Sequence, residues 1–141
     1  MQNQITTAQA ITERMRLDFV DTEGLSTPLD AEFEYDPADP FAVSVLFCDE
    51  PTPVRWTFAR ELLIEGFYEP TGDGDVHVWP CLSPEGAAVV ILELSSPSGE
   101  VLVQVSSRTL SAFIHQMVAM VPQGAEETLI DLDAEIAQLI A

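Results

Sequence analysis

Lysine is absent from this 141-residue sequence, and the five arginines stand against 24 aspartates and glutamates, which gives a net charge of −19. Nucleic-acid binding depends on basic side chains that neutralise phosphates, so this charge argues against nucleic acid as a partner. Anionic membrane surfaces are disfavoured for the same reason. Because the acidic residues are spread along the whole chain, they predict a solvated surface that aids solubility rather than a dedicated acidic docking patch.

Long apolar runs and paired cysteines are also missing. No apolar run of about 18 residues occurs, and the N-terminus has no basic stretch followed by an apolar one. We therefore expect a cytoplasmic protein with no segment inserted in a membrane. The only cysteines, Cys48 and Cys81, lie far apart and form no CxxC motif. In a reducing cytosol they predict two free thiols in the core rather than a disulfide.

The composition that remains is that of a globular protein, with 47% hydrophobic and 21% charged residues. Its length predicts one domain over residues 1–141, with the polar residues 1–9 disordered. Apolar and polar side chains alternate over much of the chain, which is typical of half-buried strands. The predicted strands cover 11–19, 29–35, 42–49, 53–59, 76–79, 87–96 and 100–107.

The first two predicted strands should pair antiparallel, which would place Arg14 and Arg16 opposite a row of acidic side chains. The strand at 87–96 is different, because both of its faces are apolar except at Glu93. Such a strand must be covered on both sides, by helices or by a neighbouring subunit.

The stretch from Trp56 to Pro80 holds both tryptophans, which bracket a predicted strand–turn–strand unit. Residues 59–66 within it predict a short helix that Gly66 terminates. Residues 70–74 contain one proline and two glycines, which predict a turn.

The last third of the sequence changes to a helical period. Apolar residues recur at helical spacing from Leu110 to Val121, with serines at 106 and 107 and a threonine at 109 as N-cap candidates. After a linker at 122–131, a second short helix is predicted around 132–140, with Asp131 and Asp133 at its start. The predicted fold is therefore α+β, with antiparallel β-sheets of about seven strands and C-terminal helices packed on them. Two short helices are too few to cover the apolar strands, so we infer contacts between subunits.

Residues with catalytic or metal-binding potential are few. His77 shares a predicted strand face with Asp75 and Trp79, and an Asp75–His77 pair could act in acid–base chemistry, but no motif ties a nucleophile to it. His115 falls on the flank of the predicted helix, where a rim position is expected. The HxxxH, CxxC and DxDxDG metal patterns are absent. The glycines at 72 and 74 lack the lysine and following helix of a phosphate-binding loop. We predict no catalytic residue, metal ion or cofactor.

Three residues are candidates for contact with a protein partner. Arg55 and Arg60 flank the aromatic residues of the predicted strand at 53–59, and Trp79 lies near the end of the strand at 76–79. Arginine and tryptophan are enriched at binding hot spots, which is the basis for a docking role. The alternative, which the acidic composition favours for the two arginines, is that they form ion pairs with the acidic residues around them.

Several stretches together resemble the SsgA-like proteins, an actinobacterial family of sporulation and cell-division proteins, and most of all its SsgB branch. The central block at 56–80 is the most specific match, whereas the first 30 residues resemble the family only as an amphipathic strand pair. The matching stretches are YDPADPFAV (35–43), WTFARELLIEGFYEPTGDGDVHVWP (56–80), LSSPSGEVLVQV (94–105), FIHQMVAMVPQGAE (113–126) and DLDAEIAQLIA (131–141).

This resemblance implies a non-enzymatic regulator in the cytoplasm at the division septum, where the SsgB type helps to position the tubulin-like division protein FtsZ. It implies a Whirly-like fold of antiparallel sheets with C-terminal helices, assembled as homo-oligomers such as trimers. FtsZ and other SsgA-like proteins are the implied partners, and no partner-contact residue is carried over. Two alternatives differ in class. One is a single-stranded nucleic-acid-binding protein on a Whirly-like fold, which the net charge opposes. The other is an acid–base enzyme or small-ligand binder that uses His77 and Asp75.

Overall fold

The computed structural model of the chain describes residues 9–48, 53–128, 136 and 138–139. The predicted disordered start at 1–9 and the predicted helix at 132–140 therefore fall almost entirely outside the described residues. No helix in the described part of the chain has the length and hydropathy needed to span a bilayer.

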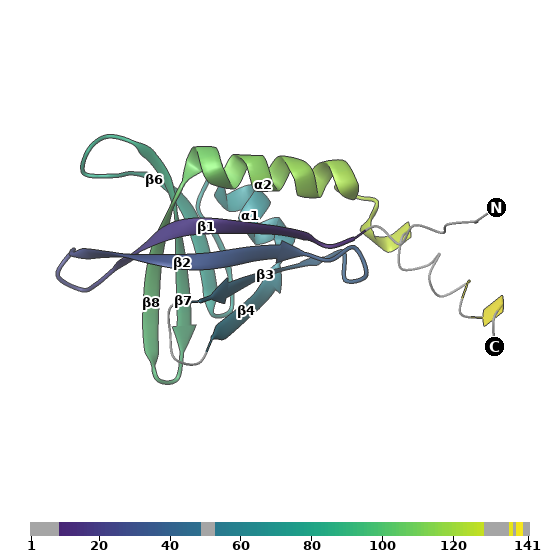
Figure 1. The fold of residues 1–141 in the computed structure, drawn as a ribbon, viewed down its shortest axis with the longest axis horizontal. Helices are drawn as coiled ribbons and strands as arrows, with labels where there is room; N and C mark the ends of the chain where they lie inside the picture. The colour runs from purple at the N-terminus through teal and green to yellow at the C-terminus, as the bar shows by residue number, and fades with distance from the viewer. Residues whose placement is uncertain (1–8, 49–52, 129–135, 137, 140–141) are drawn as a thin grey trace.

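Eight strands and the helices α1 and α2 make up most of the described part of the chain (Figure 1), and residues 126–128 are also helical. The sequence predicted about seven strands, and the additional one is a three-residue strand, Thr71–Asp73, on residues predicted as a turn. The elements are β1 (Ile11–Val20), β2 (Ser26–Tyr35), β3 (Ala42–Phe47), β4 (Val54–Ala59), α1 (Arg60–Gly66), β5 (Thr71–Asp73), β6 (Val76–Leu82), β7 (Ala88–Ser96), β8 (Gly99–Ser106) and α2 (Ser107–Met120).

All eight strands belong to one sheet, in the order β4-β3-β2-β1-β8-β7-β6-β5, and every neighbouring pair is antiparallel. The sheet curls strongly, and α1 connects β4 at one edge to β5 at the other (Figure 1). The predicted α+β class with antiparallel sheet and C-terminal helix is confirmed. The likeness to a Whirly fold stays a prediction.

The register of β1 against β2 matches the predicted charge pairing. Arg14 lies opposite Glu32, and Arg16 lies opposite Asp30. Opposite charges across an antiparallel pair contribute only tenths of a kcal/mol at an exposed face. They nevertheless favour this register over a one-residue slip, which would turn the apolar side chains outward.

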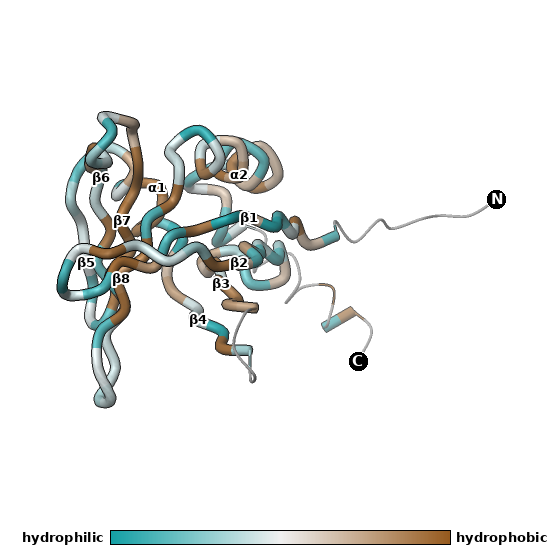
Figure 2. Tube along the Cα trace, turned by 60° about the vertical axis from the view of Figure 1, so that its left-hand side comes forward, coloured by the Kyte–Doolittle hydropathy of each residue, from teal (hydrophilic) through white to brown (hydrophobic). Residues whose placement is uncertain are grey.

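The core fills the inside of the curl and is closed by α2. Leu110, Phe113 and Met117 recur at helical spacing and are all buried, as the periodicity predicted. The ring of Phe113 meets the ring of Phe33 from β2 edge to face, with centroids 5.6 Å apart. Figure 2 shows the apolar stretches of β7 and β8 running through the body of the molecule. The helix begins at the predicted place, although the N-cap Ser106 makes no side-chain capping bond.

Both faces of β7 are sheltered within a single chain, so this strand does not require a neighbouring subunit. Val90 and Leu92 are fully buried on the core side. On the other side Val89 is 6% exposed and Ile91 is 5% exposed, and Ile91 lies in register between Trp79 and Gln104 of the adjacent strands. The premise for subunit contacts at this strand was therefore wrong, and assembly into homo-oligomers stays a prediction that needs other support.

Gly66 is the last residue of α1, as predicted, but its backbone is not left-handed. The described residues show no positive φ at Gly66, and the helix is followed by Phe67 in the right-handed helical region. A Cβ atom at position 66 would lie 2.3 Å from Cγ1 of Val78. The glycine is therefore needed for the close packing of α1 on β6. The turn glycine is Gly74, whose φ of 61° closes the β5–β6 hairpin.

Candidate functional site

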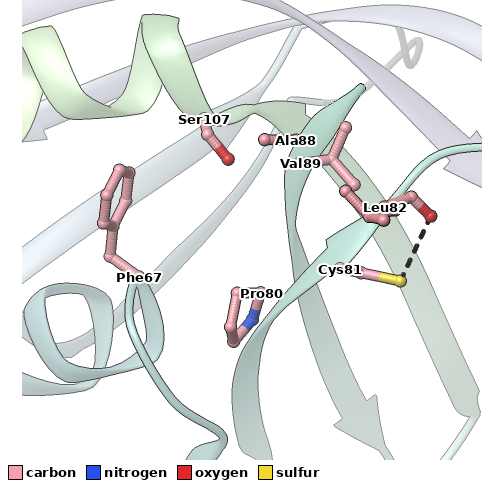
Figure 3. Close-up of a pocket in the computed structure, with 7 residues that line it drawn as sticks. All are labelled: Phe67, Pro80, Cys81, Leu82, Ala88, Val89 and Ser107. Atoms are coloured by element: carbon pink, nitrogen blue, oxygen red, sulfur yellow. Dashed lines mark hydrogen bonds between the residues drawn. The ribbon is translucent and has the colours of Figure 1, made fainter. Parts of the chain in front are cut away.

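An apolar groove opens where the β6–β7 hairpin meets the end of α1 and the start of α2 (Figure 3). Its volume is about 520 Å³, which falls within the range of pockets that receive ligands or side chains. The lining residues come from β6, β7 and the start of α2, together with the residue that follows α1, and the fold brings their apolar atoms together. They are Phe67, Pro80, Cys81, Leu82, Ala88, Val89 and Ser107.

Local hydrogen bonds hold the hairpin that forms one wall of this groove. The β6–β7 pairing ends at Leu82 opposite Ala88. Beyond it, the backbone N–H of Ser83 donates to the carbonyl of Ala87 at 2.8 Å, and the N–H of Ala87 donates to Oγ of Ser83 at 3.1 Å. Gly86, with a φ of 84°, completes the turn. These bonds support the part of the hairpin that extends beside the start of α2 (Figure 1).

Two large apolar side chains at this groove face water. Leu82 lines the groove and is 68% exposed, and Tyr68, beside the lining residue Phe67, is 78% exposed. The rings of Phe67 and Tyr68 pack edge to face with centroids 5.1 Å apart. Large apolar groups gathered at an open groove are typical of protein-contact surfaces. The groove can therefore bury apolar side chains of a partner.

The cysteines are free, as predicted, but they are not core thiols. Cys81 is exposed at the groove, where its thiol donates a weak hydrogen bond to the carbonyl of Leu82 at 3.4 Å. Cys48 is half-buried at the end of β3. The alternation of side chains along β6 explains why Cys81 is not in the core. Val76 and Val78 point to the core, and Cys81, an odd number of residues further along the strand, points to the opposite face.

Arg60 is the predicted partner-contact residue that the structure contradicts. Its side chain is fully buried at the start of α1, and a partner cannot reach it. Nε and Nη2 of Arg60 donate to Oε2 of Glu126 at 3.2 Å and 2.8 Å, and the guanidinium lies 5.3 Å from the ring centroid of Tyr35. The alternative that Arg60 forms an ion pair is confirmed, with a carboxylate 66 residues away.

Glu126 is a buried ion-pair residue that the sequence did not single out, because it falls in a stretch predicted to be a linker. Its second oxygen, Oε1, accepts a 2.7 Å hydrogen bond from the backbone N–H of Gly124. The hydrogen bonds from Arg60 hold the pKa of Glu126 below its ordinary value, although burial acts in the opposite direction. The pair thereby fastens the chain that leaves α2 to the start of α1.

Tyr35 completes this buried cluster. Its hydroxyl donates to the carbonyl of Pro40 at 2.9 Å, and burial raises its pKa despite the nearby charge of Arg60. Nη1 of Arg60 has no hydrogen-bond partner within the described part of the chain. Within the described part of the chain, two groups therefore stabilise the positive charge of Arg60: the carboxylate of Glu126 and the face of the Tyr35 ring.

The other two predicted contact residues lie on separate surfaces. Arg55 is half-exposed on β4 and forms an ion pair with Glu34 of β2, with Nη1 and Oε1 3.1 Å apart. Trp79 is half-buried on β6, in register with Ile91. Because β4 and β6 stand near opposite ends of the strand order, the two residues do not form one patch across neighbouring strands.

His77 does not form the predicted pair with Asp75. Asp75 lies in the β5–β6 turn, whereas His77 lies opposite Glu93, with Nδ1 and Oε1 3.5 Å apart. The imidazole is half-exposed against Gly72, and it is not among the residues that line the groove. His115 is on the exposed flank of α2 as predicted, with Nδ1 2.9 Å from the carbonyl of Ser111. Among the described residues, no group of three or more histidines, cysteines or carboxylates could hold a metal ion.

Comparison with known proteins gives consistent matches. The model of the SsgA family, Streptomyces sporulation and cell division protein SsgA, matches residues 29–126. The sporulation-specific cell division protein SsgB of Frankia casuarinae is 45% identical over 134 residues, covering 93% of this chain and 92% of the relative. The protein of the same name from Streptomyces coelicolor is 43% identical over 128 residues, covering 90% of this chain and 93% of the relative.

Solved structures agree with the fold over nearly the whole chain. An SsgA-like sporulation-specific cell division protein from Thermobifida fusca superposes with a TM-score of 0.84 at 36% identity, covering 96% of this chain and 98% of that one. An SsgB structure, from work on longitudinal cell division during sporulation of Streptomyces coelicolor, gives a TM-score of 0.82 at 39% identity, covering 89% of this chain and 99% of that one.

Proposed function

The chain belongs to the SsgA family of sporulation and cell division proteins, and from this premise we propose that it is a non-enzymatic adaptor at the division septum. In this role it positions the tubulin-like division protein FtsZ by contact between protein surfaces. The observation that carries the proposal is the family match, which spans residues 29–126 and agrees with relatives named for cell division in sporulation.

The side-chain chemistry of the described surface supports contact rather than catalysis. The groove is lined mainly by carbon atoms and exposes Leu82, while the only described histidine near a carboxylate, His77, pairs with Glu93 at a half-exposed strand position. Exposed apolar side chains and a half-exposed arginine are the features that protein interfaces use. Arg55 and Trp79 remain the proposed contact residues for FtsZ, since Arg60 is buried.

Two measurements test this function. Deletion of the gene should displace or abolish sporulation septa in fluorescence micrographs of dividing cells, and the tagged protein should capture FtsZ from the same cells. Arg55→Glu and Trp79→Ala should each reduce capture, because both substitutions alter accessible side chains on the sheet. Glu23→Arg, which reverses a charge in the exposed β1–β2 turn, is the matched control. Normal septation in the deletion strain, together with no capture of FtsZ, would overturn the proposal.

A further inference from the structure

We propose that the outer edge of β4 binds an extended segment of another protein, which pairs antiparallel to β4 and adds a strand to the sheet. The segment has one kind of chemistry: its apolar side chains alternate with polar ones, and one of the polar ones is an acidic residue beside Arg55. This inference goes beyond the adaptor role, because it specifies a mode of peptide recognition that does not depend on FtsZ being the partner.

The first support is that β4 is an open edge. It stands at one end of the strand order, and β3 is its only neighbour in the described sheet. Figure 1 shows β4 at the rim of the curled sheet, beside β3. Most residues of the strand are exposed to water; they are Val54, Arg55, Thr57 and Ala59. Among the described residues, no strand lies on the far side of this edge.

The second support is the direction of the backbone groups. Opposite residues of an antiparallel pair alternate between those that exchange two backbone hydrogen bonds and those that exchange none. The N–H of Arg60 donates to the carbonyl of Phe41 at 2.8 Å, so that pair is of the first kind. Thr57 and Arg55 lie an odd number of residues back along the same register and are of the second kind. Their N–H and C=O groups therefore point away from β3, towards the open edge.

The third support is that this edge lacks the features that usually prevent strand addition. Exposed edges are commonly protected by proline, a bulge, extreme shortness or a charge that points inward. β5, the edge strand at the other end of the sheet, has only three residues, with Gly72 at its centre. β4 has six residues in unbroken register and contains no proline or glycine. Its one charged residue, Arg55, pairs with Glu34 on the outer face of the sheet. The edge of β4 can therefore continue the ladder.

The side chains of β4 specify the alternation of the segment. Trp56 and Phe58 pack against the core, and Val54 on the same face is 45% exposed. An added strand would place every second side chain beside Val54 and Trp56. Those side chains should be apolar, because they would cover the exposed part of this face.

The other face of β4 favours an acidic side chain, although the whole chain carries a charge of −19. Each arginine of β1 and β4 on this face has an acidic neighbour on β2, so their charges offset one another. The pairs are Arg14 with Glu32, Arg16 with Asp30, and Arg55 with Glu34. Arg55 is half-exposed and uses one N–H group, at Nη1, to bind Oε1 of Glu34. A guanidinium has five N–H donors, so a second carboxylate beside it is well matched.

Nuclear magnetic resonance of the isotope-labelled full-length protein tests this edge. The probe is an end-blocked peptide of about seven residues in which valine alternates with threonine and glutamate, the alternation that strand addition requires. The backbone amides of Arg55 and Thr57 should exchange with water readily in the free protein. At a peptide concentration of about ten times Kd, their exchange should slow by about 10-fold, because about one molecule in eleven is then unbound.

Thr57→Pro removes an N–H that points at the open edge and leaves the hydrogen bonds to β3 in place. It should weaken peptide binding by about 10-fold or more. Thr57→Ala is the matched control, because it also loses the hydroxyl contact with Ser44 but keeps the N–H, and it should bind as the unmodified protein does. Arg55→Gln should weaken binding of the glutamate peptide and leave a glutamine version of the peptide unaffected. Circular dichroism checks that each variant is folded.

Three results would overturn the inference. They are no binding of the peptide, equal binding by Thr57→Pro and Thr57→Ala, and slowed amide exchange at the groove beside Leu82 in place of β4. If a second copy occupied the edge, Thr57→Pro would lower the light-scattering mass while the peptide failed to bind, which also counts against the proposal. Capture of FtsZ is measured separately, so its failure bears on the adaptor role and not on this edge.

Discussion

Replacing Glu126 with glutamine should strongly lower the free energy of unfolding of this protein, although the two side chains have nearly the same shape. Oε2 of Glu126 accepts two hydrogen bonds from Arg60, and Oε1 accepts one from the backbone of Gly124. In the variant, an amide nitrogen in place of Oε2 would point its own N–H groups at the N–H groups of Arg60, and no acceptor would remain for them. If the amide turns over, Gly124 loses its acceptor instead. In either orientation the charge of Arg60 stays buried without a counter-ion.

The magnitude follows from that unpaired charge. Removing one partner of a buried ion pair costs about 3–5 kcal/mol. The upper part of this range applies here, because Arg60 is fully buried and its Nη1 already has no partner among the described residues. A domain of this size has a total stability of about 5–15 kcal/mol, so the change is a large fraction of it. The melting temperature should fall by about 10–15 °C.

Thermal and urea unfolding followed by circular dichroism provide the measurement. Glu127→Gln is the matched control, because residue 127 makes the same chemical change at an exposed position next to it and should alter stability by less than about 0.5 kcal/mol. The double variant Arg60→Met, Glu126→Met should recover much of the loss, since apolar pairs often replace buried ion pairs without penalty. A Glu126→Gln variant as stable as the Glu127→Gln control would refute the assignment of the pair as a buried, coupled unit.

Acidification should weaken the fold through the same group. The pKa of Glu126 is lowered in the folded state, so its contribution is complete above the ordinary value of 4.5 and is lost as pH falls through the folded pKa. Urea midpoints measured from neutral to acid pH should decline less steeply in Glu126→Gln. Gly66→Ala should cost about 1–3 kcal/mol of unfolding free energy, because its methyl would clash with Val78, and an unchanged urea midpoint would contradict this packing. Cys81 should react with a thiol reagent faster than the half-buried Cys48 in the folded protein, and equal rates would count against the described exposures.

Periodicity predicted most of the fold correctly, because it depends on neighbours in the sequence. Alternation located β1 and β2 and the face of each that is buried, and it predicted that Arg14 and Arg16 face the acidic row of β2, whereas the register that sets Arg14 against Glu32 came from the structure. Helical spacing located α2 for the same reason. The exception is β5, where a three-residue strand contains Gly72 and borders Gly74, so its local signal is that of a turn and only pairing with β6 makes it a strand.

The candidate site was far less predictable, because its parts meet only after folding. The groove joins the end of α1, the β6–β7 hairpin and the start of α2, and no spacing in the sequence relates them. Arg60 looked like a surface residue because it follows an exposed strand residue in an acidic stretch. Its partner Glu126 follows a proline and a glycine in a segment with the composition of a linker. Nothing local distinguishes that carboxylate from its exposed neighbour Glu127.

The negative charge of the chain and the location of its exposed apolar side chains together determine where another acidic surface can approach it. At −19, copies of this protein repel over the Debye length of about 10 Å that holds at 0.1 M salt. Adventitious contacts between acidic faces are therefore disfavoured, and close approach is favourable only where apolar burial or an arginine outweighs repulsion. The described exposed arginines lie on β1, β4 and the first turn of α2, whereas the most exposed apolar groups gather at the groove and at Leu139. Only the start of α2 brings an exposed arginine, Arg108, next to a groove-lining residue. An acidic surface with this distribution of exceptions restricts favourable contact with another acidic surface to a few places.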